Sequence, residues 1–442
     1  MKDFVRDLKN SGIQNFIKLD KISKGIIQPI NEITSIKKDN DNVLVINFND
    51  KKFEHWLSQK QLISPWETHW YQLKDKEYLT LEKGLLQKLI NLGGHKAGNL
   101  NKLRKILKVS QLFVYYGVKG KTETITVKNL RKLLSYLNIP YDELNNKIIE
   151  IRKGKKASIK NPKFPINLLT PESASIIGAL VSDGCISIDR KARMTKRVKY
   201  CTNNLEDIEL FTKNIQKIFG NVLISSEKVR NSTVVRIGTS IVADSFLRVG
   251  CILGKKSVKD RGIPWIIKEA NSELKKRYLS TVFSDEGSVG KLHKPYIILS
   301  RAKHLNNILA DEDLKTLDRC IESNMETHKI RSHYIKKISI RKFIKIVKDS
   351  NKSSASDMVT QILRVGIPKL LLDESNLLKE FEIENKIYII KLSKTFNGTY
   401  SLTSSLVIRK KESLLRFYKE IGFQSSDKQN KLEKYLKKVG WL

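Results

Sequence analysis

Apolar residues recur every three to four positions between residues 78 and 150, and this spacing predicts amphipathic helices. One helix is expected over residues 100–107. Ser110 suits the N-cap of the next helix, and Thr126 suits the N-cap of a third, because their hydroxyls can accept hydrogen bonds from free backbone N–H groups. This stretch therefore predicts several short helices in succession.

The N-terminal stretch has a different pattern. Residues 32–36 and 43–48 are plausible strands, and KKDNDN between them is typical of a turn. Trp56, Trp66 and Trp70 follow closely. We expect them to fill a core, with base stacking as the alternative.

Two apolar segments, at residues 169–188 and 272–289, share one pattern. Each predicts a helix that ends in a small residue, an acid and a glycine, and each is followed by a predicted strand. The two copies are IIGALVSDG (176–184) and LSTVFSDEG (279–287). An internal repeat of this kind predicts an architecture with pseudo-twofold symmetry.

The first helix of the pair is apolar nearly all round, so it must be buried in a core or against a twin. Gly178 and Ser182 are four residues apart and share one face, where small side chains let two helix backbones approach. Thr281 and Asp285 occupy the matching places in the second copy. These four residues are the predicted helix interface.

Asp183 and Glu286 stand directly before the final glycine of each copy. A carboxylate at a helix C-terminus is unfavourable by roughly 0.3–1 kcal/mol, and two brought together would repel further. A divalent cation, Mg²⁺ or Mn²⁺, could offset this and would suit phosphodiester hydrolysis. The alternative is that both acids merely sit in turns.

The charge of the chain points to a polyanionic partner. Its 442 residues include 83 Lys and Arg against 46 Asp and Glu, which gives a net charge of +37. We expect double-stranded DNA, with RNA as an alternative. An anionic membrane is the runner-up, but no basic amphipathic helix stands out.

Other classes of protein are disfavoured. No window approaches 18 apolar residues, and the N-terminus has no apolar run, so neither a transmembrane helix nor a secretory signal is expected. The four cysteines form no CxxC pair, which disfavours a disulfide scaffold or a zinc ribbon. We expect a cytoplasmic, nucleoid-associated protein.

The motif copies IIGALVSDG and LSTVFSDEG resemble those of the LAGLIDADG homing endonucleases, in the single-chain, two-repeat, archaeal-type form. The resemblance implies an α+β fold in which an αββαββα unit occurs twice and forms a pseudo-twofold saddle over DNA. It implies a monomer in which Asp183 and Glu286 bind the catalytic metal. Thr281 departs from the glycine of the first copy.

The same resemblance implies polar or basic residues beside the metal. By strand position these are Asn203 or Asn204 in the first repeat, Ser300 or Arg301 in the second, and Lys291 beyond Glu286. We take Asn203, Arg301 and Lys291 as the candidates. The first repeat has no lysine at the place of Lys291.

The run from NLNKLRKILKV to IPYDEL, residues 99–144, resembles a helix-turn-helix of the Cro/repressor type. The resemblance implies that Ser110, Gln111 and Tyr115 lie where major-groove contacts are made. A small helical bundle for protein contacts is the alternative.

Basic residues concentrate on the predicted hairpins, where two-stranded ribbons could enter a major groove. The run 329–348 alone holds eight Lys and Arg and no acid. The expected DNA contacts are Arg190, Arg193, Lys196, Arg197, Lys199, Lys228, Arg230, Arg236, Arg331, Lys336 and Arg341.

These patterns predict four regions and one leading function. The regions are a β-containing region over 1–75, an all-α helix-turn-helix domain over 76–150, a basic linker over 151–168, and an endonuclease domain over 169–442 with repeats at about 169–260 and 271–442 and an insertion near 310–395. The leading hypothesis is a Mg²⁺-dependent, sequence-specific homing endonuclease that cuts both strands, with intron or intein mobility. The alternatives are a weak or inactive DNA-binding regulator and an RNA maturase. An active self-splicing intein is not expected, because the chain starts Met-Lys and ends Trp-Leu.

Overall fold

The structure is a computed structural model. It describes residues 33–38, 43–48, 51–58, 61–62, 64, 66–153, 156–189, 195–254, 256–291, 294–306, 308–330, 333–349, 359–360, 362–364, 366–395 and 397–442. The chain divides into two compact units. The first comprises Met1–Leu180, Ile186–Cys251 and Trp265–Leu274, and the second comprises Val181–Cys185, Ile252–Pro264 and Lys275–Leu442. Both mix helices and strands, in agreement with the expected α+β class.

The first unit begins with a four-stranded antiparallel sheet. Its strands follow chain order: β1 (Ile33–Lys38), β2 (Val43–Phe48), β3 (Lys51–Ser58) and β4 (Gln61–Leu62). The strand expected over 43–48 is confirmed, and β1 begins one residue later than expected. Trp66 and Trp70 are buried, so their predicted core role is confirmed, whereas the side chain of Trp56 lies outside the described residues.

Four helices follow, and the last three lie at the places that the sequence predicts. They are α3 (Leu85–Ala97), α4 (Leu100–Leu107), α5 (Gln111–Val118) and α6 (Val127–Leu137). Both predicted caps are present. The Phe113 N–H donates to Ser110 Oγ at 3.2 Å, and the Asn129 N–H donates to Thr126 Oγ1 at 3.3 Å.

A five-stranded sheet packs with these helices, and it corrects two predictions. Its order is β13-β9-β8-β6-β7. The strands are β6 (Tyr78–Leu81), β7 (Thr124–Thr126), β8 (Ile148–Lys153), β9 (Lys156–Lys160) and β13 (Asn221–Val222). The region over 76–150 is therefore not all-α.

The basic stretch over 151–168 is not a linker. Most of it lies in β8, β9 and β10 (Ile166–Asn167), and β10 pairs with β5 (Glu67–Thr68). The physical reason is that Ile151, Ile159 and Ile166 are fully buried between the lysines. The charge of the run hid this apolar pattern.

The rest of the first unit contains a second four-stranded sheet with the order β11-β12-β15-β14. The elements in chain order are α7 (Pro171–Val181), β11 (Cys185–Asp189), β12 (Thr195–Thr202), α8 (Leu205–Phe219), β14 (Ile224–Val229), β15 (Ser232–Ile237), α9 (Ser240–Arg248) and α11 (Trp265–Lys268). The last residue of α7 is counted with the second unit. The strand predicted after the first motif copy is confirmed as β11.

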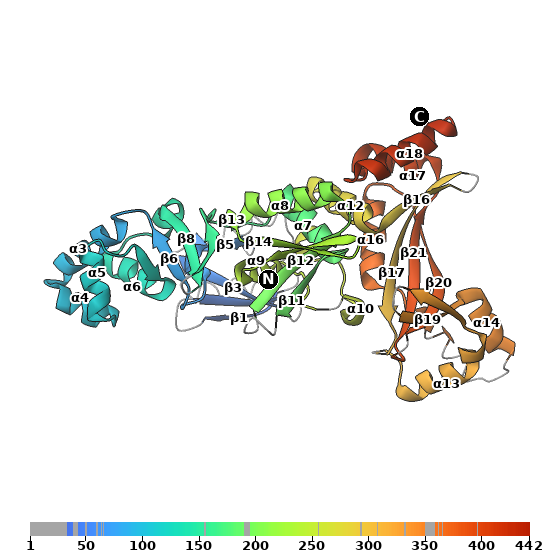
Figure 1. Ribbon diagram of the computed structural model, residues 1–442, viewed down its shortest axis with the longest axis horizontal. Coiled ribbons are helices and arrows are strands. Elements are labelled where there is room, and N and C mark those ends of the chain that lie inside the picture. Colours follow the sequence, from blue (N-terminus) through green and yellow to red (C-terminus); the bar gives the residue numbers. More distant parts are fainter. Residues whose placement is uncertain are drawn as a thin grey trace. The chain divides into compact units, whose positions relative to one another are not determined.

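The second unit is built on a six-stranded antiparallel sheet with the order β16-β17-β21-β20-β19-β18. Its elements in chain order are α10 (Lys256–Lys259), α12 (Ser272–Glu286), β16 (Gly287–Lys291), β17 (Pro295–His304), α13 (Asp311–Ile321), β18 (Glu326–Ile330), β19 (His333–Ser339), α14 (Ile340–Asp349), α16 (Lys369–Glu380), β20 (Lys386–Thr395), β21 (Tyr400–Ile408), α17 (Lys411–Arg416) and α18 (Ser426–Lys438). Figure 1 shows α13 and α14 at one end of this sheet and α17 and α18 at the other.

Two sheets share one strand permutation. In β11-β12-β15-β14 and in β16-β17-β21-β20, the first strand of the set pairs with the second, the second with the fourth, and the fourth with the third. The insertion expected near 310–395 contains β20, which belongs to the shared strand order. Only the rest of that segment is therefore an insertion. The basic run 329–348 is half helix, because α14 occupies its second part and buries Phe343.

Candidate active site

The carboxylates of Asp183 and Glu286 lie close enough to interact. Asp183 follows the end of α7, and Glu286 is the last residue of α12; both belong to the second unit. Partial desolvation and then the negative charge of Glu286 raise the pKa of Asp183. Asp183 is exposed, and the side chain of Glu286 is 23% exposed, so both remain accessible to a ligand.

The end of α12 is fixed by packing. Leu279, Val282 and Phe283 are fully buried, which anchors the last turns of the helix. At Gly287 an added Cβ would lie 2.5 Å from the Phe283 carbonyl oxygen. Glycine is therefore required after Glu286 because the backbone passes directly over the helix end.

Two lysines cap the ends of these helices. Lys256 Nζ donates to the carbonyl oxygens of Ser182 and Gly184, the latter at 2.9 Å. Lys428 Nζ on α18 donates to the carbonyl oxygens of Ser284, Asp285 and Gly287, the last two at 3.3 and 2.6 Å. Positive charge at a helix C-terminus is favourable. The lysines therefore offset much of the unfavourable energy of placing Asp183 and Glu286 at helix ends. The sequence had suggested a metal for this role.

Arg301, on β17, is the predicted basic residue that reaches the acids. Its Nη1 donates to Glu286 and to the Val181 carbonyl oxygen at 3.1 Å. Its Nε and Nη2 bind both carboxylate oxygens of Glu374 at 3.1 and 2.5 Å. Burial disfavours the charge of Arg301, but the carboxylates of Glu286 and Glu374 outweigh this and raise its pKa.

Sequence reasoning missed three members of this site. Glu374, on α16, is fully buried, and Lys256 and Lys428 lie far from the motif copies along the chain. Lys256 supplies the second unit with a cation beside Asp183 although the first repeat has no lysine at the place of Lys291. No local pattern marks any of the three, because each is defined only by what it contacts in the folded chain.

The catalytic roles predicted for the other residues stay predictions. Asn203 is exposed and lies in the first unit, and its neighbour Asn204 caps α8. Ser300 pairs its hydroxyl with that of Ser405 at 2.7 Å. The side chain of Lys291 lies outside the described residues. Arg301 is a basic candidate for which a bond to Glu286 is described.

The predicted helix interface is described in part. Gly178 is buried in the first unit, and Ser182 is buried in the second. Thr281 is also buried, and its hydroxyl donates to Gln424 Oε1 at 2.9 Å. Asp285 is half-buried. The pairing of the two helices stays a prediction.

The donor set fits a hard divalent cation that is shared with a ligand. Within the described part of the chain no group of three or more His, Cys, Asp or Glu residues could hold a metal. Asp183 and Glu286 are a pair, and together they offer a cation two carboxylates. Mg²⁺ is commonly held by one or two carboxylates together with phosphate oxygens and water. The pair suits a metal whose coordination is completed by phosphate oxygens and water rather than a cage built by protein alone.

Several predicted DNA contacts on the first unit are engaged by acids. Lys196 pairs with Asp244 at 2.6 Å, Arg197 with Asp189 at 2.9 Å, and Arg236 with Glu227. Lys199 stands opposite Arg236 in the β12–β15 ladder. Lys228 is exposed on β14, and Arg230 forms the following turn with φ 56°.

The contacts predicted in the second unit are mixed. Lys336 is half-buried on β19 and shares a face of the strand with buried Ile338, which packs in one core cluster with Phe343 of α14. Arg341 is exposed on α14 rather than on a ribbon. Arg190, Arg193 and Arg331 lie outside the described residues.

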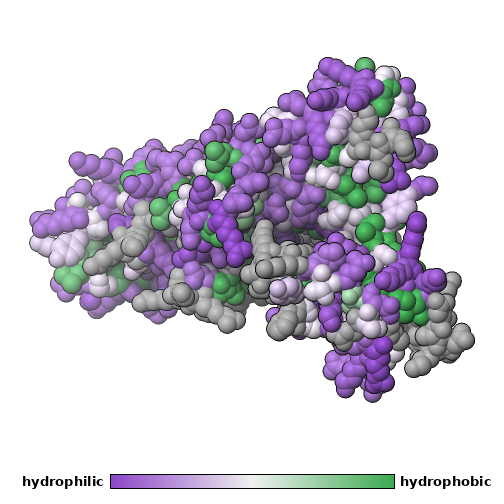
Figure 2. Space-filling model, turned by 45° about the vertical axis from the view of Figure 1, so that its right-hand side comes forward, coloured by the Kyte–Doolittle hydropathy of each residue, from purple (hydrophilic) through white to green (hydrophobic). Residues whose placement is uncertain are grey.

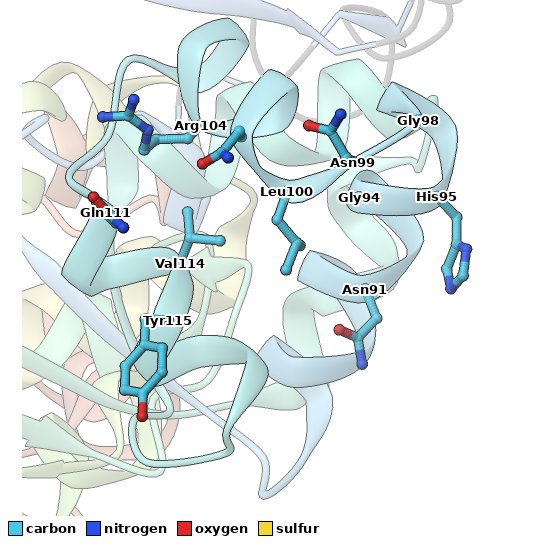
Figure 3. Close-up of a pocket in the computed structure, with 11 residues that line it drawn as sticks. Asn91, Gly94, His95, Gly98, Asn99, Leu100, Arg104, Gln111, Val114 and Tyr115 are labelled. Carbon is cyan, nitrogen blue, oxygen red and sulfur yellow. The ribbon is translucent and has the colours of Figure 1, made fainter.

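Two of the predicted major-groove residues, Gln111 and Tyr115, border a hollow between α3, α4 and α5. Its volume is about 650 Å³, and it is lined by Asn91, Gly94, His95, Gly98, Asn99, Leu100, Asn101, Arg104, Gln111, Val114 and Tyr115. Figure 3 shows Gln111, Val114 and Tyr115 along α5 and Arg104 on α4. Ser110 and Gln111 are exposed, and Tyr115 is 51% exposed, so α5 presents polar and aromatic groups to a ligand.

The surface is predominantly hydrophilic over the face shown in Figure 2. None of the described helices has the length and apolar character needed to cross a membrane. Such a surface agrees with the chain's net charge of +37 and with a polyanionic ligand.

Comparison with known proteins gives partial matches. No family model matches the chain. A segment of 187 residues is 26% identical to the glutamine–fructose-6-phosphate aminotransferase (isomerizing) of Methanocaldococcus jannaschii, and it covers 42% of this chain but only 16% of that protein. The chain thus spans about a sixth of the length of this curated relative.

The similar solved structures include homing endonucleases. The structure of I-DmoI with DNA and Ca has a TM-score of 0.29 and 12% identity, covering 57% of this chain and 88% of that chain. I-DmoI with DNA and Mn has a TM-score of 0.27 and 14% identity, covering 58% and 97%. The LAGLIDADG homing endonuclease I-SmaMI bound to cleaved DNA has a TM-score of 0.20 and 12% identity, covering 47% and 95%. These scores assign no activity to the chain, so its interpretation rests on the geometry above.

Proposed function

We propose that the chain is a metal-dependent, sequence-specific DNA endonuclease of the LAGLIDADG homing type. One observation carries the proposal. Asp183 and Glu286 each stand at the end of a helix and directly before a glycine, and Arg301 Nη1 donates both to Glu286 and to the carbonyl oxygen of Val181, two residues before Asp183. The shared strand permutation of two sheets supports the proposed duplication of the αββαββα unit.

The residues have distinct roles in this proposal. Asp183 and Glu286 hold Mg²⁺ or Mn²⁺, which when bound supplies an activated water and neutralises charge that develops on the phosphate. Arg301 holds the Glu286 carboxylate in place. Lys256 and Lys428 fix the two chain segments that carry the acids and add positive charge near the phosphates.

The DNA-binding surface is proposed on two grounds. The net charge of +37 favours a polyanion. In the helical region, α5 exposes Gln111 and Tyr115 beside a hollow large enough for backbone and base contacts. We propose this helix as the recognition helix of a helix-turn-helix, and the exposed basic residues of the hairpins as phosphate contacts.

A DNA cleavage assay tests the function. The full chain is incubated with a genomic DNA library and Mg²⁺, and the ends are sequenced. We expect staggered double-strand cuts at a small set of sites, which Asp183→Asn and Glu286→Gln abolish. Glu380→Gln serves as a matched control, because this acid pairs with Lys275 outside the site.

Two other functions give different results in that assay. A DNA-binding regulator on the same scaffold would bind specific sites without cutting in Mg²⁺. An RNA maturase would bind RNA in preference to DNA. The aminotransferase activity of the curated relative is not proposed, because the match covers 16% of that protein. Association with a mobile intron or intein is part of the proposal, and the sequence around the gene tests it.

A further inference from the structure

Arg301 joins two carboxylates of different kinds. Its Nη1 is directed to Glu286, a proposed metal ligand, while its Nε and Nη2 form a two-pronged bond with Glu374 at 3.1 and 2.5 Å. One side of the guanidinium thus binds Glu286 in the site, and the other side binds Glu374 on α16.

Glu374 has no other evident task. Glu374 is fully buried, with 0% of its surface exposed to solvent. It lies on a helix whose Leu370, Leu371 and Leu378 are also buried. A buried carboxylate is costly unless it is paired. Besides Arg301, its described contact is the Tyr278 hydroxyl at 3.5 Å. Its principal partner is therefore the positive charge of Arg301.

With Glu374 included, the charges at this site balance. The carboxylates are Asp183, Glu286 and Glu374, and the cations are Arg301, Lys256 and Lys428. Without Glu374 the same set would carry a net positive charge. A site of that sign would repel a divalent cation before any DNA phosphate arrives.

We propose that Glu374 is a positioning residue that neutralises Arg301 and thereby keeps the Asp183–Glu286 pair available to a divalent cation. This inference rests on the proposed function, because it concerns the metal affinity of the same acids. It assigns a role to α16, which lies in the segment that the sequence marked only as an insertion.

The test measures Mn²⁺ binding to the full chain without DNA, by the electron paramagnetic resonance signal of free Mn²⁺. We expect Glu374→Gln to weaken binding by on the order of tenfold to hundredfold, since it leaves one uncompensated positive charge beside the site. Glu380→Gln is the matched control on the same helix, because Glu380 is half-exposed and pairs with Lys275 outside the site. It should leave the affinity unchanged.

Glu374→Asp separates charge from structure. It keeps a negative charge beside Arg301, so Mn²⁺ affinity should stay within about threefold of the unsubstituted chain. A folded Glu374→Asp variant that binds Mn²⁺ tenfold more weakly than the unsubstituted chain would overturn the inference, even if Glu374→Gln fails to fold. Unchanged affinity in folded Glu374→Gln would overturn it as well.

The same Mn²⁺ titration distinguishes a failure of this inference from a failure of the proposed function. If Mn²⁺ binds and Glu286→Gln abolishes the binding, but Glu374→Gln has no effect, only the role of Glu374 is wrong. If the unsubstituted chain shows no Glu286-dependent binding, the metal site itself is refuted, and the role of Glu374 with it.

Discussion

Lys256 and Lys428 make matching contacts at the ends of two helices. Lys256 donates to the carbonyl oxygens of Ser182 and Gly184, and Lys428 to those of Ser284, Asp285 and Gly287. In each case the lysine binds the backbone on both sides of the position that carries the acid. The lysines therefore set the positions of Asp183 and Glu286 through the backbone.

Replacing Lys428 with methionine should destabilise the protein. The change removes charge-assisted hydrogen bonds from carbonyl oxygens that are partly shielded from water, with an expected loss of about 1.5–3 kcal/mol in the free energy of unfolding. Urea denaturation followed by circular dichroism measures it. Lys434→Met, at an exposed position of the same helix, should change stability by less than about 0.5 kcal/mol. Equal effects of the two substitutions would contradict the capping role.

Asp183→Asn should stabilise the protein at neutral and alkaline pH while abolishing cleavage. Partial desolvation and the charge of Glu286 raise the pKa of Asp183 above its ordinary value of 3.8, so the folded chain holds this proton more tightly than the unfolded chain. Stability then falls as pH rises through the window between the two pKa values, and it stays lower above that window.

The asparagine variant lacks this fall. Because Asp183 is exposed and screened, we expect the gain above the window to be less than about 1 kcal/mol, and it should vanish below pH 4. Thermal unfolding at several pH values without divalent cations measures it. A variant that is less stable than the parent at pH 8 would show that the ionised Asp183 carboxylate does not destabilise the folded chain.

Tyr115→Ala should weaken DNA binding with little effect on folding. Tyr115 is 51% exposed on α5, so its loss should cost under about 0.5 kcal/mol of stability. If α5 contacts bases, the affinity for target DNA should fall by about 1–3 kcal/mol in fluorescence anisotropy. Tyr136→Ala, on α6 of the same region, is the control and should bind DNA as the parent does. An unchanged affinity in Tyr115→Ala would argue for the alternative of a bundle that contacts protein.

Gly220→Ala should be strongly destabilising. Gly220 has φ +90° at the end of α8, and an added Cβ would lie 2.2 Å from the backbone oxygen of Asn161, next to β9. The clash and the left-handed conformation together should cost about 2–4 kcal/mol. Gly84→Ala has a similar φ of +78° but open space around the Cβ, so it should lose only about 1–2 kcal/mol. Equal losses, measured by thermal unfolding, would mean that residues 160–161 do not pack against this helix end.

The sequence by itself determined those features that depend on a few neighbouring residues. Ser110 and Thr126 cap their helices where the hydroxyls predict it, because a cap bond joins residues three apart. Asp183 and Glu286 could be matched because the same short pattern occurs twice. Their interaction could be expected from that repetition.

Only the tertiary structure decided which charges meet. Glu374 reaches Arg301 from α16, Lys428 reaches the end of α12 from α18, and Lys256 comes from the end of the first repeat. No spacing in the sequence predicts these contacts. The stretch over 151–168 joined a sheet because Ile151, Ile159 and Ile166 found a core, although its lysines suggested a solvated chain. Burial and ion pairing depend on the whole fold, whereas caps and short motifs depend on residues that are already adjacent.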